Sequence, residues 1–325
     1  MPERIPDWRK EFGYGNFISL DHHRSGFARM MQGEVFFREI EENCWNPELR
    51  IDQYAAYGTQ VQVICTIPVL FAYWAKPEDT LKVSQFLNDH IAEIVQNHPK
   101  NYVGLATLPM NDIPMAVEEL RRAKKIGFKG IQIGSNINGK NLSDESFHPL
   151  WKALEEEDMS VMVHPWEMMG ENDMKKYWLP WLVGMPAETA RAMASLIFGG
   201  VLEKYSKIRF LFAHAGGSFI PTLGRLDHGF NCRPDLVAID NPNPPSSYLK
   251  KFWVDSATHD EDLLRYILAK QGSEKVALGT DFPFPLGDLH IGRFIEDMKL
   301  EKHDLEMIMH GSALSWLNLE YSQFA

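Results

Sequence analysis

The chain has 325 residues, 45% hydrophobic and 24% charged, a composition typical of a soluble globular protein that excludes a disordered chain, a fibre and a coiled coil. Its formal net charge of -11 gives no general attraction for phosphates, so nucleic-acid binding is not expected. No apolar run reaches the roughly 18 residues that span a bilayer, and three widely spaced cysteines predict a reducing, cytoplasmic location rather than a disulfide framework.

The first 45 residues are predicted to form a small antiparallel appendage, because two short apolar runs, Asn16–Leu20 and Val35–Phe37, lie among glycines and charges. From residue 46 onward, short apolar runs alternate with amphipathic stretches. The runs are rich in β-branched or aromatic residues, as expected of buried parallel strands. They are Val61–Ile67, Tyr102–Leu108, Gly130–Ile133, Ser160–Val163, Ile208–Ala213, Phe252–Val254 and Lys275–Leu278.

The amphipathic stretches have recognisable helix ends. Pro77-Glu78-Asp79 opens one helix with a proline and two acids in its first turn. Three more helices are predicted to end at a glycine: Val117–Ile126 at Gly127, Ala187–Phe198 at Gly199 and Asp260–Gln271 at Gly272.

Strands that alternate with helices predict an α/β protein of the (β/α)₈ TIM-barrel type. We expect one domain over residues 1–325, with the appendage at 1–45 and the barrel and C-terminal helices at 46–325. An open doubly wound sheet is the alternative, but no G-x-G-x-x-G follows the first run. The seven runs are one fewer than the eight strands of a barrel, so either the first strand is missing or one of the strand predictions is wrong.

Histidine and aspartate follow four consecutive runs: His164, His214, Asp255 and Asp281. In a barrel the C-terminal ends of the strands form one rim, which holds the active site. Imidazole and carboxylate together suit a divalent metal such as zinc, which lowers the pKa of a bound water. We predict His164 and Asp281 as metal ligands and His214 as an acid–base group.

Two ligands are fewer than the three that usually hold a catalytic zinc. Barrel metallohydrolases commonly supply a further pair as His-x-His at the end of strand one, but the sequence contains no His-x-His. The adjacent residues His22 and His23 would point to opposite sides of an extended segment and make a poor pair.

Two arginines and one apolar segment are further candidates. Arginine binds carboxylates bidentately, so Arg38 and Arg225 could bind an acidic substrate, although the residues alone favour a solvated surface charge for each. The aromatic segment Trp178–Met185 fits core packing, a dimer interface or a pocket wall.

Longer motifs carry a family resemblance over essentially the whole chain. The most specific is KYWLPWLVGMPAET at Lys176–Thr189, supported by HPWEM at His164–Met168, FAHAGGSF at Phe212–Phe219 and GTDFPFPLG at Gly279–Gly287. With these motifs the chain resembles the aminocarboxymuconate-semialdehyde decarboxylase family of the amidohydrolase superfamily.

The resemblance implies a zinc-dependent barrel enzyme that removes CO₂ without oxidation from 2-amino-3-carboxymuconate 6-semialdehyde, an intermediate of tryptophan breakdown by the kynurenine route. It thereby diverts flux from quinolinate and NAD synthesis toward picolinate. By resemblance His164 and Asp281 are zinc ligands, and His214 is the base that activates the zinc-bound water. Arg38 would bind a substrate carboxylate, and Arg225 would do so from the neighbouring subunit of a homodimer.

The sequence departs from the family pattern at several points. Family members begin with a strand bearing His-x-His, whereas Met1-Pro2-Glu3 aligns with the loop after that strand. We expect a start at the wrong methionine or a shortened isoform; the alternative is a real shortened protein that holds zinc poorly. Ala215 replaces a usual glycine, Phe282 replaces a common tyrosine, and one extra residue precedes Arg38.

Three functional hypotheses follow. The first is the metal-dependent decarboxylase of the muconate semialdehyde. The second is a related barrel decarboxylase or hydrolase of another aromatic acid. The third is a catalytically silent chain that pairs with a full-length enzyme.

Overall fold

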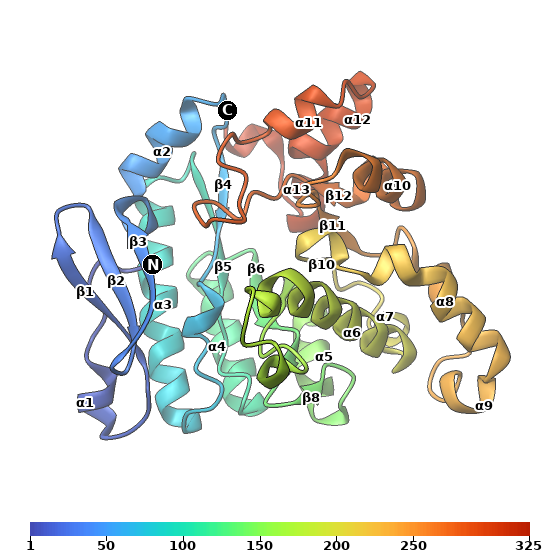
Figure 1. Ribbon diagram of the computed structural model, residues 1–325, viewed down its shortest axis with the longest axis horizontal. Helices are drawn as coiled ribbons and strands as arrows, with labels where there is room; N and C mark the ends of the chain where they lie inside the picture. The colour runs from blue at the N-terminus through green and yellow to red at the C-terminus, as the bar shows by residue number, and fades with distance from the viewer. The chain divides into compact units, whose positions relative to one another are not determined.

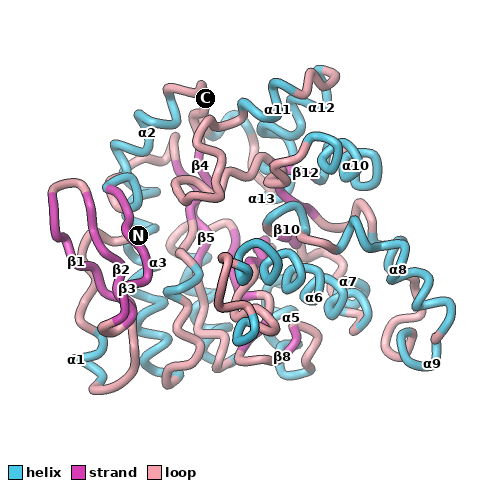
Figure 2. The backbone as a smooth tube through the Cα atoms, viewed as in Figure 1, coloured by secondary structure: helices cyan, strands magenta, loops and turns pink.

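The computed structural model describes residues 1–325, which form two compact units. The first unit comprises residues 1–128 and 323–325, and the second comprises residues 129–322. Figure 1 shows both units coloured along the chain, and Figure 2 separates their helices from their strands.

An antiparallel sheet of three strands occupies the start of the first unit, which confirms the predicted appendage (Figure 1). Its strands are β1 (Ile18–Arg24), β2 (Phe27–Gln32) and β3 (Val35–Glu41), each paired antiparallel with the next. The central strand β2 was not predicted, because its sequence FARMMQ has no β-branched residue. Its buried residues Ala28 and Met30 nevertheless alternate with the exposed Arg29, as in a half-buried strand.

The rest of the first unit places a long helix against parallel strands. Strand β4 (Gln62–Ile64) pairs parallel with β5 (Tyr102–Ala106). Helix α3 (Pro77–Asn97) starts at the predicted proline and lies against β5, burying Val83, Leu87 and Ile91. The other helices of this unit are α1 (Trp8–Phe12), α2 (Pro47–Ala55) and α4 (Ile113–Lys125).

The second unit contains five parallel strands, which pair in the order in which they occur along the chain. A doubly wound sheet reverses its strand order at a switch point, whereas a barrel sheet always adds the next strand on the same side. The unbroken order therefore favours the barrel type over the doubly wound alternative. The strands are β6 (Gly130–Gly134), β9 (Ser160–His164), β10 (Phe210–Phe212), β11 (Trp253–Asp255) and β12 (Val276–Ala277).

All seven predicted parallel strands are thus present, two in the first unit and five in the second. A short antiparallel hairpin, β7 (Asn136–Ile137) with β8 (Lys140–Asn141), follows β6. No helix of the described chain combines the length and the apolar character that crossing a bilayer would need. That residues 1–325 form a single barrel domain stays a prediction.

Helices follow the strands of the second unit, and both of its helices predicted to end at a glycine do so: α6 (Met185–Phe198) ends before Gly199 and α10 (Glu261–Gln271) before Gly272. In the first unit, α4 ends at Lys125, two residues before Gly127. Helix α10 begins after Asp260, whose carboxylate accepts the N–H of Leu263, and ends at Gly272 with a φ of +81°. At the end of α6, Gly199 has a φ of -77°, which any residue can adopt. A Cβ there would lie 2.4 Å from the Cβ of Ser143, so glycine is required by close packing.

The helices of the second unit are mostly short, and α6 and α8 are the longest. They are α5 (His148–Glu156), α6 (Met185–Phe198), α7 (Val201–Lys204), α8 (Phe219–Cys232), α9 (Pro234–Val237), α10 (Glu261–Gln271), α11 (Arg293–Asp297), α12 (Lys302–Glu306) and α13 (Ser312–Leu317).

Candidate metal centre

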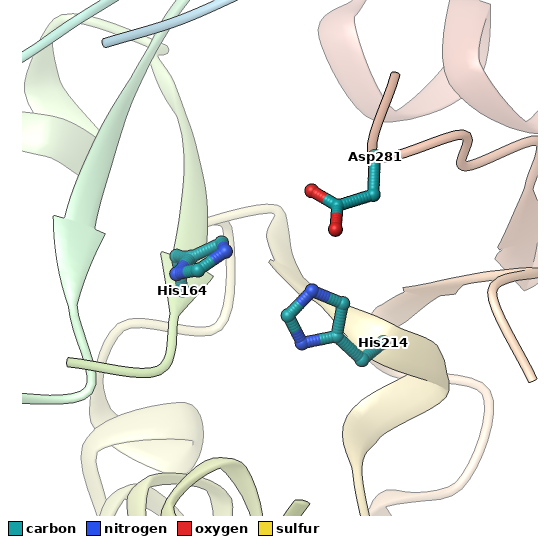
Figure 3. Close-up of side chains that lie close together, drawn as sticks. All are labelled: His164, His214 and Asp281. Carbon is teal, nitrogen blue, oxygen red and sulfur yellow. The ribbon is translucent and has the colours of Figure 1, made fainter. Parts of the chain in front are cut away.

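Three side chains converge beyond the C-terminal ends of strands in the second unit (Figure 3). His164 is the last residue of β9, His214 follows β10, and Asp281 follows β12. One ligand atom from each lies within 4.8 Å of the others. The three sequence-predicted residues are therefore brought together, as their positions after parallel strands led us to expect.

The imidazole of His164 is oriented by a hydrogen bond to the backbone. Its Nδ1 lies 2.8 Å from the carbonyl oxygen of Pro165. A carbonyl can only accept, so Nδ1 carries the proton and Nε2 offers its lone pair. Burial, together with the neighbouring His214, lowers the pKa of His164 to about 4. A neutral imidazole with one free nitrogen is the form that binds a metal.

His214 lies on a turn of unusual backbone conformation. His214, Ala215, Gly216 and Gly217 all have positive φ, between 56° and 75°. The buried carboxylate of Asp255 accepts the backbone N–H of His214 and of Ala215, each at 2.8 Å. Both oxygens of Asp255 are thus used by backbone, and this acid supports the turn instead of joining the cluster.

The imidazole of His214 is half-buried and faces that of His164, with ring centroids 5.0 Å apart and planes at 79°. Neither ring nitrogen of His214 makes a hydrogen bond within the described chain. Burial lowers the pKa of His214, and the charge of Asp255 opposes this effect. A neutral ring without a protein partner is available as a ligand or as a proton acceptor.

The donor set fits a divalent metal. Two atoms about 2.1 Å from a common ion lie at most about 4.2 Å apart, so small side-chain rotations close the remaining gap. Two imidazoles and a carboxylate are the ligands that zinc and manganese share.

The turn that carries His214 also contacts the first turn of helix α6. The carbonyl oxygen of Pro186 accepts the backbone N–H of Ser218 at 3.0 Å and its hydroxyl at 3.2 Å. A Cβ at Gly217 would lie 2.4 Å from that same oxygen. Glycine is therefore required at this position both by its φ of +58° and by the close approach of α6.

Arg38 lies on β3 in the first unit, and a β-bulge precedes it. Met30 pairs with Arg38 and Met31 pairs with Phe36, which leaves Phe37 as the extra residue of the ladder. The bulge accommodates one more residue in β3 than in the facing part of β2. Without it, a one-residue insertion would turn every later side chain of the strand to the opposite face.

Arg225 lies on α8 with its side chain exposed. It forms no ion pair within the described chain. In the apolar segment Trp178–Met185, Leu182 and Val183 are 51% and 54% exposed, so core packing does not account for these two side chains. Pro180 and Gly184, from the same π-helical turn, are buried.

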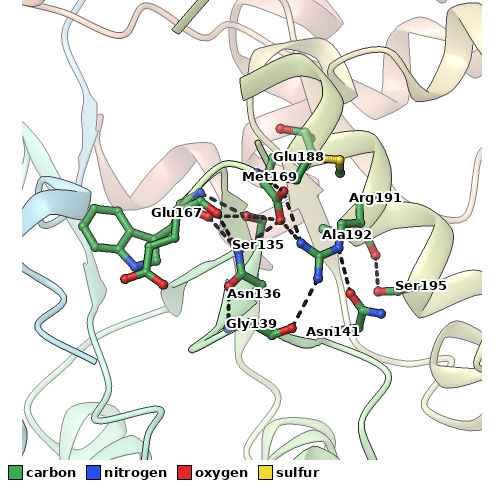
Figure 4. Close-up of polar contacts among 12 residues, drawn as sticks. Ser135, Asn136, Gly139, Asn141, Glu167, Met169, Glu188, Arg191, Ala192 and Ser195 are labelled. Atoms are coloured by element: carbon green, nitrogen blue, oxygen red, sulfur yellow. Dashed lines mark hydrogen bonds and ion pairs between the residues drawn. The ribbon is translucent and has the colours of Figure 1, made fainter. Parts of the chain in front are cut away.

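Sequence reasoning gave no role to Glu188, which lies in the first turn of α6 and is fully buried. Its carboxylate contacts residues from several segments, including Met169 in the loop that follows His164 (Figure 4). No local signal separates a buried glutamate from an exposed one, because both occur in the first turn of a helix.

Comparison with known proteins places this site in a family. The chain belongs to the amidohydrolase family, whose model matches residues 25–319. Among curated proteins it is 48% identical to 2-amino-3-carboxymuconate-6-semialdehyde decarboxylase of Dictyostelium discoideum, over 100% of this chain and 91% of that protein. It is 36% identical to the enzyme of the same name from Caenorhabditis elegans, over 98% of this chain and 92% of that protein.

Solved structures show the same fold. The apo structure of Metarhizium anisopliae IDCase matches with a TM-score of 0.83 at 18% identity, covering 96% of this chain and 94% of that one. A manganese-bound 5-carboxyvanillate decarboxylase from Novosphingobium aromaticivorans matches with a TM-score of 0.77 at 23% identity, covering 86% and 82%. Taken together, the relatives identify the chain as a carboxy-lyase with an amidohydrolase-type α/β barrel fold.

Proposed function

We propose that this chain catalyses the non-oxidative decarboxylation of 2-amino-3-carboxymuconate 6-semialdehyde to 2-aminomuconate 6-semialdehyde and CO₂. The observation that carries the proposal is the convergence of His164, His214 and Asp281 within 4.8 Å, in a chain 48% identical to a decarboxylase of that name. The pathway it serves would be tryptophan breakdown by the kynurenine route, upstream of quinolinate.

His164 and Asp281 would hold the metal, which we propose to be zinc. Bound there, a divalent ion would supply Lewis-acid chemistry and lower the pKa of a water molecule. Two protein ligands leave room for a third, and His214 is close enough to serve as one. We assign it instead to proton transfer, the role that the family resemblance implies; burial lowers its pKa and keeps the ring neutral, so that it can accept a proton.

The proton balance of the reaction requires such a group. Loss of CO₂ leaves an electron pair on the carbon that carried the carboxylate, and that carbon must take up one proton. A ring nitrogen of His214 would accept a proton from water and donate it to that carbon, and the hydroxide left behind would be neutralised by a proton from the solvent, so that one proton is consumed for each CO₂ released. The turn held by Asp255 would keep the ring in place during both transfers.

Two arginines suit a substrate with two carboxylates. Arg38 would bind one of them, and Arg225 would bind the other from the neighbouring subunit of a homodimer. The exposed and unpaired side chain of Arg225 and the exposed Leu182 and Val183 support a partner surface in the second unit. The homodimer and the cytoplasmic location stay predictions.

A second candidate substrate class is an aromatic acid. The chain is 26% identical over 231 residues to a gamma-resorcylate decarboxylase of Rhodococcus jostii. A planar hydroxybenzoate carries one carboxylate, so it would need only one of the two arginines.

The test is a direct assay of the purified chain, supplied with zinc and then with manganese. We expect loss of the muconate semialdehyde with release of one CO₂ per molecule and no turnover of gamma-resorcylate. His164→Ala protein serves as the inactive control. Turnover of the hydroxybenzoate alone would replace the first proposal by the second, and turnover of neither by metal-loaded protein would refute both.

A further inference from the structure

One peptide unit joins His164 to a buried polar cluster, whose own contacts Figure 4 shows. The carbonyl of Pro165 accepts the proton on Nδ1 of His164 at 2.8 Å. The N–H of the same peptide, which belongs to Trp166, donates to Oγ of Ser135 at 3.0 Å. In a trans peptide the C=O and the N–H point in opposite directions, so His164 and Ser135 bond to opposite edges of the same peptide group.

Ser135 is itself held by its neighbours. Its hydroxyl proton can go to Oε1 of Glu188 at 3.3 Å or to the carbonyl of Trp166 at 3.2 Å. The side-chain amide of Asn136 bonds the same two acceptors, at 3.0 Å to Glu188 and 2.7 Å to Trp166. Ser135 and Asn136 therefore hold the backbone N–H and carbonyl of Trp166, and both of these side chains also bond to Glu188.

Glu188 is a fully buried carboxylate, which is costly unless every oxygen is satisfied. Its Oε2 accepts the backbone N–H of Met169 at 3.1 Å, and Arg191 lies 3.3 Å from Oε1. The partners of Glu188 thus come from the segment directly after β6, from the loop after β9 and from α6. An acid that only stabilised its own helix would bond the N–H groups of that helix, but Glu188 bonds the loop that carries the metal-site backbone.

We propose that Glu188 and Ser135 are positioning residues for the metal site. They fix the Pro165–Trp166 peptide so that its carbonyl keeps the proton of His164 on Nδ1 and leaves Nε2 directed to the ion. Metal-ligating histidines usually donate their other N–H to a carboxylate or carbonyl, and removing that support weakens metal binding. This inference rests on the proposed role of His164 as a ligand.

The test compares Ser135→Ala and Glu188→Gln with Ser195→Ala. Ser195 is a matched control, because its hydroxyl bonds only the carbonyl of Ala192 in the same helix, at 2.9 Å. Metal affinity is measured by competition of Zn²⁺ with a chelator, and the visible absorption of Co²⁺-loaded protein reports the ligand geometry. We expect Ser135→Ala and Glu188→Gln to weaken affinity about 10- to 100-fold and to alter the cobalt spectrum, with no change in Ser195→Ala.

Stability of the metal-free protein separates positioning from folding. Suppose that Ser135→Ala and Glu188→Gln lower the urea midpoint of the metal-free chain while the zinc affinity and the cobalt spectrum stay as in the wild type. In that case the two residues are only structural, and the proposal is overturned. If Glu188→Gln does not fold, Ser135→Ala decides alone. His164→Ala tests the underlying assignment: unchanged affinity in that variant would refute His164 as a ligand, whereas lost affinity there with unchanged affinity in Ser135→Ala would refute only the present inference.

Discussion

The carboxylate of Asp255 accepts the backbone N–H of His214 at 2.8 Å, so an acid at the end of one strand fixes the main chain that follows the neighbouring strand. The same carboxylate accepts the N–H groups of Ala215 and Ala257 through its second oxygen. A buried aspartate thus satisfies three backbone donors that would otherwise have no partner.

Asp255→Asn is expected to destabilise the fold by about 1–3 kcal/mol, because the amide NH₂ would face the N–H of His214 and leave that donor unsatisfied. Urea unfolding measures the change, and the decarboxylase rate should fall with it. Asp260→Asn is the control: Asp260 caps α10, and asparagine caps a helix about as well as aspartate. Equal losses in the two variants would show that Asp255 has no special role.

Gly217→Ala should lower stability by at least about 2 kcal/mol, because the new methyl group would meet the carbonyl of Pro186 and the backbone has positive φ. Gly224 lies in the interior of α8 with open space around its Cβ position. Gly224→Ala is expected to stabilise by about 0.5–1 kcal/mol, the opposite sign. Thermal unfolding of both variants checks the pair, and a neutral Gly217→Ala would contradict the close contact with α6.

His164→Ala and His214→Ala should differ in metal content. If His164 is a ligand and His214 a proton-transfer group, the first variant loses metal and activity, whereas the second keeps the metal and loses about 10²–10⁴-fold in rate. Metal analysis after gentle dialysis, with the assay on the same samples, makes the comparison. Loss of metal from His214→Ala would make that histidine the third ligand.

The proposed contribution of Arg225 across a dimer predicts complementation. Arg225→Ala and His164→Ala proteins are each expected to be inactive. Mixed dimers would contain one complete site, with His164 from one chain and Arg225 from the other, so mixing after subunit exchange should restore activity. No recovery in verified mixed dimers would place Arg225 in the site of its own chain or outside any site.

Arg38→Ala should raise the KM for the muconate semialdehyde at least tenfold if Arg38 binds a carboxylate. Arg24→Ala is a suitable control, because Arg24 lies in the same antiparallel sheet and pairs with Glu39 at the surface. Steady-state kinetics on both variants gives the answer. An unchanged KM in Arg38→Ala would remove Arg38 from the substrate site.

The sequence was informative where chemistry is local. Short β-branched runs marked the seven parallel strands, and the polar residues after three of them became the His164, His214 and Asp281 cluster. Strand β2 was not predicted, because it has no β-branched residue. Its strand conformation comes from pairing with β1 on one side and β3 on the other.

The contacts by which residues distant in the sequence hold the site in place could not be predicted. Asp255 was expected at the rim with the others, but whether a carboxylate binds an ion or backbone N–H groups depends on which loop lies over it. The positive φ of Ala215 was equally hidden, because alanine gives no signal for a left-handed conformation. Glu188 acts through residues that lie about 50 positions earlier in the chain, as with Ser135 at a separation of 53.

The contacts of the first turn of α6 have a mechanical consequence for the two imidazoles. Pro186 holds the turn after His214, and two residues later Glu188 holds the loop after His164. Helix α6 is therefore a common support for the segments that follow the two histidines. One short stretch of chain, Pro186–Glu188, thus bonds to the backbone on both histidine-bearing segments, so a substitution that disturbs the start of α6 would reach both imidazoles of the cluster at once.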